Sequence, residues 1–289
     1  MLINVEVVER IPQREANLVE RIEWMNKHVY LFSPRVWKNG STRAAFPDGP
    51  LNEASYVLAG LRSEMAFEPT YRKLLSGLTE LHCATPNYLT TQPYSTLAHI
   101  YLSEKTGEKH ALQQKLMSFK LPSPTLDRLF FVQELDTKMA IAGYNKVVDQ
   151  LISKSIKSDL SGYTATHVVL YSTRFFSSNA RLSQHSCEEL FDFICRCIDA
   201  RELDASLDLL LELLASYLYL ANTIGSPKLN DTRVHNLASL KLNEEKCQRA
   251  RQDSDNDLDP NIYHQCLAAV LLSRELLRIA SDRKMKGVK

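Results

Sequence analysis

The sequence predicts an all-helical protein, on three observations. Only nine glycines occur in 289 residues. Apolar residues recur at spacings of three and four, as at Val148, Ile152 and Ile156, which is the period of an amphipathic helix. Strand-like alternation is confined to the first eight residues. We therefore expect helices nearly throughout, with a short extended arm at residues 1–10.

Start and stop signals divide the chain into about twelve helices. The predicted helices span residues 15–31, 50–65, 68–82, 93–105, 109–119, 124–142, 144–157, 163–175, 186–198, 204–222, 232–250 and 261–282. Four prolines, at positions 50, 93, 124 and 260, lie in predicted first turns, where a missing N–H does no harm. They fall on every second helix, which favours an arrangement in helical hairpins.

The predicted helix 186–198 has a recognisable start. Ser186, Cys187, Glu188 and Glu189 form a capping-box pattern, in which a serine hydroxyl and a later glutamate satisfy free N–H groups. The clearest long loop lies at 33–49, which is rich in proline and glycine.

No change in composition marks a linker, so residues 1–289 are expected to form a single domain. The succession of hairpins favours an α/α-toroid-like or arched helical solenoid architecture. An ordinary multi-helix bundle is the alternative.

The charge balance argues against some partners. The chain has 35 basic and 34 acidic residues, so its net charge of +1 supplies no general attraction for nucleic acid. The most apolar stretch, 207–221, contains two carboxylates and is shorter than the roughly 20 residues of a membrane span. The N-terminus lacks the pattern of a secretion signal. We therefore expect a cytoplasmic protein that binds neither nucleic acid nor membrane; the oligomeric state stays open.

The six cysteines, at positions 83, 187, 195, 197, 247 and 266, include no CxxC pair. In a cytoplasmic chain without zinc-site spacing, such residues are free and mostly buried thiols.

Two carboxylates form the first part of a candidate site. Asp208 and Glu212 are four residues apart, so both lie on one helical face, among leucines. Buried like charges need a metal, basic partners or a shared proton. The alternative is that they bond a neighbouring helix N-terminus or an arginine.

Histidines on two other predicted helices complete the candidate site. His167 has apolar neighbours and Tyr171 one turn later on its face; His264 follows Tyr263 early in the last helix. Glu53 lies in the first turn of the second helix, where the helix dipole also favours a carboxylate. Because these are alternate helices, which share a layer and a direction in a closed array, we expect these groups to converge. A core role for His167 and a surface position for His264 are the alternatives.

The remaining sequence motifs do not indicate a specific function. The acidic loop 253–259 has the alternating carboxylates of a calcium loop, but Leu258 stands in place of the turn glycine and His264 in place of the last glutamate, so no calcium is assigned. GxGxxG, GxxxxGK[ST], GxSxG and HExxH are absent from the sequence.

The segments around these residues resemble an uncharacterised bacterial family, a domain of unknown function frequent in actinobacteria and in specialised-metabolite gene clusters. The resemblance rests on segments 166–173 and 208–214, on Tyr263-His264 and on the element 51–54. Departures are Arg174, where an acidic residue is expected, and Gln265 and Cys266, where threonines are expected.

Our first functional hypothesis is a protein of specialised metabolism that binds a small molecule or short peptide in a central cavity, with or without catalysis. His167, Asp208 and His264 are the candidate catalytic residues; Glu53, Tyr171 and Tyr263 are the candidate substrate contacts. The same cluster, His167, Asp208, Glu212 and His264, is a candidate site for a divalent metal such as zinc, iron or manganese. The alternatives are a non-catalytic helical interaction module and an α/α-toroid hydrolase or cyclase using Glu53 and Asp208.

Overall fold

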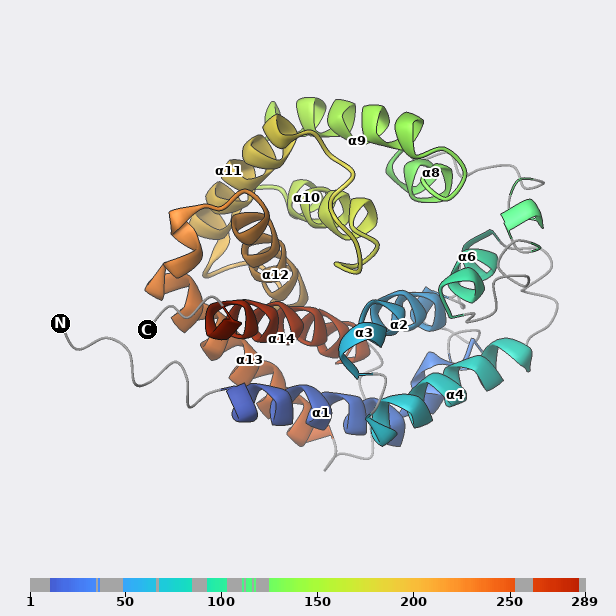
Figure 1. The fold of residues 1–289 in the computed structure, drawn as a ribbon. Coiled ribbons are helices and arrows are strands. Elements are labelled where there is room, and N and C mark those ends of the chain that lie inside the picture. Colours follow the sequence, from blue (N-terminus) through green and yellow to red (C-terminus); the bar gives the residue numbers. More distant parts are fainter. Residues whose placement is uncertain are drawn as a thin grey trace. The chain divides into compact units, whose positions relative to one another are not determined.

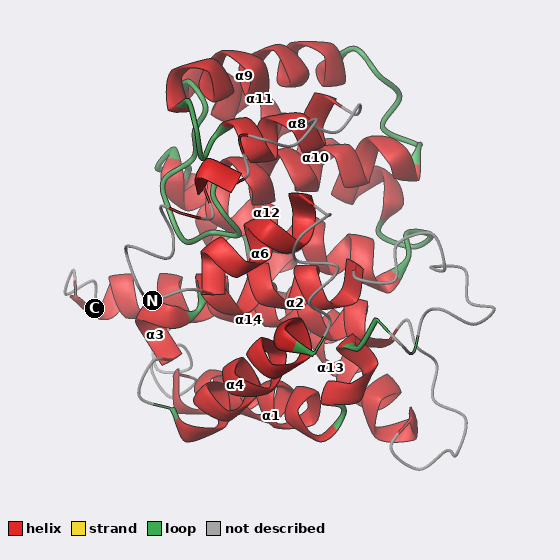
Figure 2. Cartoon of the chain, turned by 90° about the vertical axis from the view of Figure 1, so that its right-hand side faces the viewer, coloured by secondary structure: helices red, strands yellow, loops and turns green. Residues whose placement is uncertain are grey.

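The computed structural model describes residues 11–34, 36, 49–65, 68–84, 93–102, 111, 113–115, 117, 125–252 and 262–285. These residues contain twelve α-helices and no strand (Figures 1 and 2). The elements are α1 (Ile11–Lys27), η2 (Val29–Phe32), α2 (Gly49–Gly60), α3 (Arg62–Met65), α4 (Pro69–Cys83), α6 (Pro93–Leu102), α8 (Thr125–Val132), α9 (Thr137–Ile152), α10 (Asp159–Ser172), α11 (Gln184–Arg201), α12 (Leu207–Thr223), η3 (Pro227–Asn230), α13 (Thr232–Gln252) and α14 (Ile262–Met285). The predicted all-α class is confirmed, whereas the toroid or solenoid arrangement stays a prediction. The expected arm at 1–10 and the acidic loop 253–259 lie outside the described residues, as does most of the predicted helix 109–119.

One predicted division between helices is wrong. The sequence places a break at Gly143, between 142 and 144, but the break lies after α8 and α9 then continues through Gly143. The Asp136 carboxylate accepts a hydrogen bond from the Met139 N–H at 3.0 Å and so begins α9. A Cβ at position 143 would lie 2.2 Å from Cδ2 of Leu129, so Gly143 is there for close helix packing.

The capping box predicted at Ser186 is also displaced. Helix α11 begins at Gln184, and the hydroxyl of Ser183 accepts a hydrogen bond from the Ser186 N–H at 3.1 Å. Ser183 therefore has the capping role, and Ser186 is a buried residue of the first turn.

The chain divides into two compact units. The first contains Met1–Trp24, Lys154–Thr166 and Cys187–Lys289; the second contains Met25–Ser153 and His167–Ser186. Boundaries fall inside α1, α10 and α11, so each of these helices contributes residues to both units.

The first unit is built around α12. This helix packs closely on α14 and also contacts α13, and Figure 1 shows α12 and α14 as neighbours. Every residue from Leu207 to Ala221 except Asp208 is buried, as expected for a helix that is apolar on all sides.

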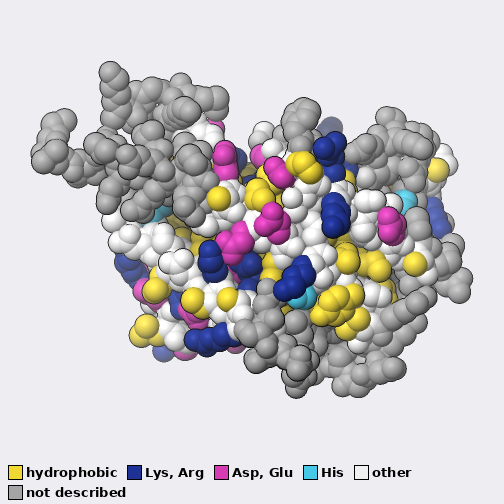
Figure 3. Space-filling model, turned by 90° about the horizontal axis from the view of Figure 1, so that it is seen from below, with side chains coloured by type: hydrophobic (Ala, Val, Ile, Leu, Met, Phe, Trp, Pro, Cys, Tyr) yellow, Lys and Arg dark blue, Asp and Glu magenta, His cyan; other side chains and the backbone are white. Residues whose placement is uncertain are grey.

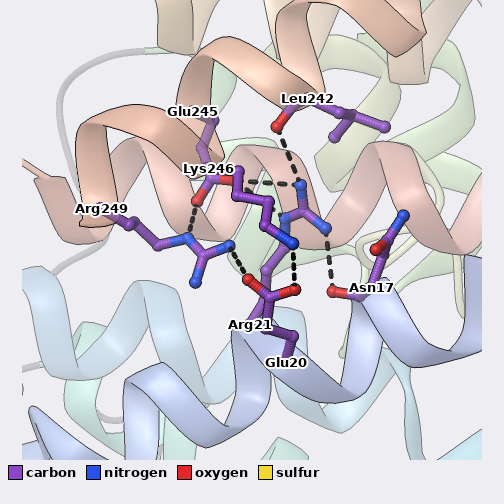
Figure 4. Close-up of polar contacts among 7 residues, drawn as sticks. All are labelled: Asn17, Glu20, Arg21, Leu242, Glu245, Lys246 and Arg249. Atoms are coloured by element: carbon purple, nitrogen blue, oxygen red, sulfur yellow. Dashed lines mark hydrogen bonds and ion pairs between the residues drawn. The ribbon is translucent and has the colours of Figure 1, made fainter. Parts of the chain in front are cut away.

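A buried ion network joins α1 to α13 in the same unit (Figure 4). Glu245 is fully buried, and its carboxylate pairs with Arg21, at 3.0 Å, and with Arg249. Arg21 also donates to the backbone oxygens of Asn17 and Leu242. All three nitrogens of the Arg21 guanidinium group are therefore hydrogen-bonded, as a buried charge requires.

The second unit has an aromatic core. Helix α2 packs on α4 and α6, and α8 packs on α9. The Phe130 ring of α8 stacks on Tyr171 of α10, with centroids 4.3 Å apart, and meets Tyr56 of α2 edge to face at 5.1 Å. These rings join three helices through contacts of preferred geometry.

The surface carries charges of both signs, as the near-zero net charge predicts, and most of the described cysteines are buried. On the described part of the face in Figure 3, acidic and basic side chains are interspersed with apolar ones. No described helix is long and apolar enough to cross a membrane. The free cysteines include Cys187, Cys197 and Cys266, which are buried, and Cys247, which is exposed; the side chain of Cys83 lies outside the description.

Candidate functional site

The first unit brings a histidine against two carboxylates. Nδ1 of His264 lies 2.9 Å from Oδ2 of Asp208, and Nε2 of the same ring lies 3.5 Å from Oε1 of Glu212. Asp208 and Glu212 lie one turn apart on α12, whereas His264 lies in the first turn of α14. The predicted shared face of the two carboxylates is therefore the face that meets α14.

Two hydroxyl groups of α10 complete this cluster. The Tyr163 hydroxyl donates to Oδ2 of Asp208 at 2.6 Å, and the buried Thr166 hydroxyl donates to Oε2 of Glu212 at 2.7 Å. Gly162 allows the two helices to approach, because a Cβ there would lie 3.2 Å from the Leu209 side chain. Neither hydroxyl was singled out from the sequence.

The side chains of the cluster differ in their exposure to solvent. The side chains of His264 and Asp208 are 20% and 18% exposed, whereas that of Glu212 is only 5% exposed. Asp208 also lies in the first turn of α12, where the helix dipole favours a negative charge. Solvent therefore reaches the His264–Asp208 pair, and the Glu212–Thr166 pair lies in the core.

The hydrogen bonds set the ionisation of Asp208. Burial alone raises the pKa of this carboxyl, but the hydrogen bonds from His264 and Tyr163 outweigh it and hold the pKa well below its ordinary value. Burial and the bond to Asp208 raise the pKa of the Tyr163 hydroxyl. Asp208 is therefore an ionised acceptor, and Tyr163 a neutral donor, near neutral pH.

Acid–base chemistry at His264 has a definite geometric requirement: Nδ1 is bonded to Asp208, so a substrate would have to replace Glu212 beside Nε2, where the present contact is 3.5 Å. Each ring nitrogen of His264 faces a carboxylate oxygen, so the imidazolium form donates toward both. A carboxylate at Nδ1 orients the ring and stabilises its positive charge, as in acid–base sites built on a histidine and an aspartate.

The other predicted site residues are divided between the two units. Tyr263 is fully buried in the core of the first unit, next to His264. Glu53, His167 and Tyr171 belong to the second unit. There the rings of His167 and Tyr171 stack with centroids 5.3 Å apart, which confirms their predicted common face. The convergence of Glu53 and His167 with the carboxylates of α12 stays a prediction.

The predicted metal site would use residues of this cluster as ligands. Among the described residues, no group of three or more His, Cys, Asp and Glu side chains is arranged to hold a metal ion. In the observed geometry both nitrogens of His264 are directed at carboxylate oxygens, so a metal would have to displace one of these contacts.

The fold and the cluster together define an all-α protein with a partly exposed histidine–carboxylate site. The chain belongs to the family DUF6895, a domain of unknown function, whose model matches residues 110–260. The match includes Tyr163, Asp208 and Glu212 but ends before His264. It confirms the expected membership of an uncharacterised family. No curated protein and no solved structure matches the chain.

Proposed function

We propose that this chain binds a small molecule or short peptide and acts on it by acid–base chemistry at the Asp208–His264 pair. The observation that carries the proposal is the position of His264, which is held by Asp208 at 2.9 Å while a fifth of its side chain stays exposed. A histidine used only as a packing contact has no need of an oriented ring and access to solvent.

The residues have separate roles in this proposal. His264 gives and takes the proton, and Asp208 orients the ring and offsets its positive charge. Tyr163 fixes the Asp208 carboxylate through its 2.6 Å hydrogen bond. Glu212, buried and bonded to Thr166, anchors α10 to α12 and supplies a second negative charge beside Nε2. A setting in specialised metabolism, expected from the family resemblance, is part of the proposal.

A non-catalytic interaction module is the second candidate. The observation that favours it is that the same side chains tie three helices together, since Asp208 accepts from both α10 and α14. In that case the cluster stabilises a helical scaffold and a partner binds elsewhere.

A ligand screen separates these functions. Compounds that raise the melting temperature of the full chain are identified first and then tested on His264→Gln. The matched control is His235→Gln, a part-buried histidine of α13 in the same unit that bonds to the Leu229 backbone oxygen. The proposal expects the shift to be lost in His264→Gln and kept in the control. Compounds that stabilise His264→Gln as strongly as the natural chain would show that they bind elsewhere and would contradict it.

A further inference from the structure

Several buried polar atoms of the second unit have no hydrogen-bond partner within the described part of the chain, and they lie around one ion pair. Glu134 is nearly buried, and its carboxylate accepts from Arg174 at 2.8 Å and from the Tyr101 hydroxyl at 3.2 Å. Arg181 reaches the same region and donates to the backbone oxygen of Gln133 at 2.7 Å. Two arginines thus accompany one carboxylate, and the positive charge of Arg174 lowers the pKa of Arg181 in addition to the effect of burial.

The unpartnered atoms belong to three neighbours of this ion pair. Nε2 and Oε1 of Gln133, the hydroxyl of Tyr144 and Nε of Arg174 are buried and have no hydrogen-bond partner among the described residues. Gln133 is 1% exposed and Tyr144 is fully buried. Arg174, Arg181 and Glu134 all act electrostatically on the Tyr144 hydroxyl, so these groups lie in one region. Buried donors of this kind normally have a partner.

The backbone beside the cluster is strained. Arg174, Phe175 and Phe176 have φ values of 50°, 53° and 64°. These values lie in the left-handed region, which is unfavourable for residues other than glycine. Contacts hold this turn: the Thr173 hydroxyl accepts from the Phe176 N–H at 2.9 Å, and the Phe175 ring stacks on Tyr56 at 5.4 Å. Strained turns kept by their surroundings are concentrated at ligand sites, and this one sets the direction of Arg174.

We propose that this cluster binds a small organic carboxylate between Arg174, Tyr144 and Gln133. The free groups are mainly donors, as a carboxylate requires. Arg174 and Arg181 exceed Glu134 by one positive charge, which one carboxylate neutralises. The Arg174 side chain is 31% exposed, so the cluster is open to solvent on that side. All residues of this site belong to the second unit, whereas the residues of the His264 cluster belong to the first.

The test is calorimetric titration of the full chain with acetate and benzoate, with chloride and phosphate as inorganic comparators. The variant is Tyr144→Phe, which removes an unpartnered hydroxyl and keeps the ring, so the unliganded protein should be no less stable than the natural chain. The control is Tyr217→Phe in the first unit, whose hydroxyl already donates to the Lys228 backbone oxygen at 2.9 Å.

We expect a carboxylate to bind the natural chain and the Tyr217→Phe control equally, and Tyr144→Phe about tenfold more weakly. Three binding results would overturn the proposal. The first is that neither carboxylate binds. The second is equal affinity in Tyr144→Phe. The third is competition by chloride or phosphate at the same concentration, which would mean an unspecific anion site. A loss of stability in unliganded Tyr144→Phe also counts against it, because the hydroxyl would then have a partner already.

Discussion

Nδ1 of His264 lies 2.9 Å from Oδ2 of Asp208, and each residue lies in the first turn of its own helix. A helix N-terminus disfavours the positive charge of an imidazolium, so the Asp208 carboxylate offsets an unfavourable position for a charged ring. The contact therefore orients the ring and also makes its protonated form tolerable at that position.

The ionised Asp208 carboxylate should make stability depend on acid pH. Its pKa is lower in the folded chain than in the unfolded one, so its contribution is present above the ordinary carboxyl pKa of about 4 and is lost as pH falls through the folded value. Asp208→Asn should therefore be less stable than the natural chain near neutral pH and approach it in strong acid. Urea unfolding at a series of pH values measures the difference, and a constant difference would contradict the assignment.

His82 should destabilise the chain in mild acid. Burial, with a smaller effect of His99, lowers the pKa of His82 to about 4 from an ordinary 6.5. The unfolded chain therefore takes up a proton first as pH falls from 6.5 to 4, which costs about 3 kcal/mol of stability over that range. The Ser55 hydroxyl donates to the Leu51 backbone oxygen, so the neutral His82 ring donates its Nε2–H to Ser55 at 3.0 Å.

The test is the pH dependence of unfolding in His82→Gln. This variant should lose most of the decline between pH 6.5 and 4, whereas His185→Gln, at an exposed position, should keep it. An unchanged decline in His82→Gln would show that another group is responsible.

The ion network of Figure 4 should be sensitive at its centre and tolerant at its edge. Glu245→Gln leaves Arg21 and Arg249 without their fully buried carboxylate, and should cost about 3–5 kcal/mol. Lys246→Gln removes only an exposed pair with Glu20 and should cost about 0–1 kcal/mol. Denaturant unfolding of the two variants compares them, and similar losses would refute this ranking.

The sequence predicts the helices better than their ends. Periodic apolar residues indicate that a helix buries one face, so each predicted helical range is helical over most of its described residues. Gly143 was read as a break because the sequence does not show that Leu129 packs against it. Ser183 was missed as a cap because the pattern Ser186–Glu189 competes with it locally.

Three residues of the cluster, Asp208, Glu212 and His264, were predicted from the sequence, and the contacts of His264 with both carboxylates confirm that these three converge. The spacing of Asp208 and Glu212 fixes their common face within one helix, and that part is confirmed. Tyr163 and Thr166 were missed because their role depends on the approach of α10 to α12 at Gly162. That glycine within an otherwise helical segment was the available signal.

The buried half of the cluster should be structural. Thr166→Val removes the 2.7 Å hydrogen bond to Glu212 and keeps the shape of the side chain, which leaves a buried carboxylate oxygen without its donor. The expected cost is about 1–3 kcal/mol, measured by denaturant unfolding. A neutral effect would mean that Glu212 is solvated and does not anchor α10.

The most direct test of the proposed acid–base role is the unfolding free energy of His264→Gln beside that of Thr166→Val. A glutamine amide still donates to Asp208, and the His264–Asp208 pair is partly exposed, so we predict a loss of no more than about 1 kcal/mol. A residue held for chemistry is expected to be replaceable at this low cost. A loss equal to or larger than that of Thr166→Val would show that His264 is an interhelical tie, and would contradict the proposal.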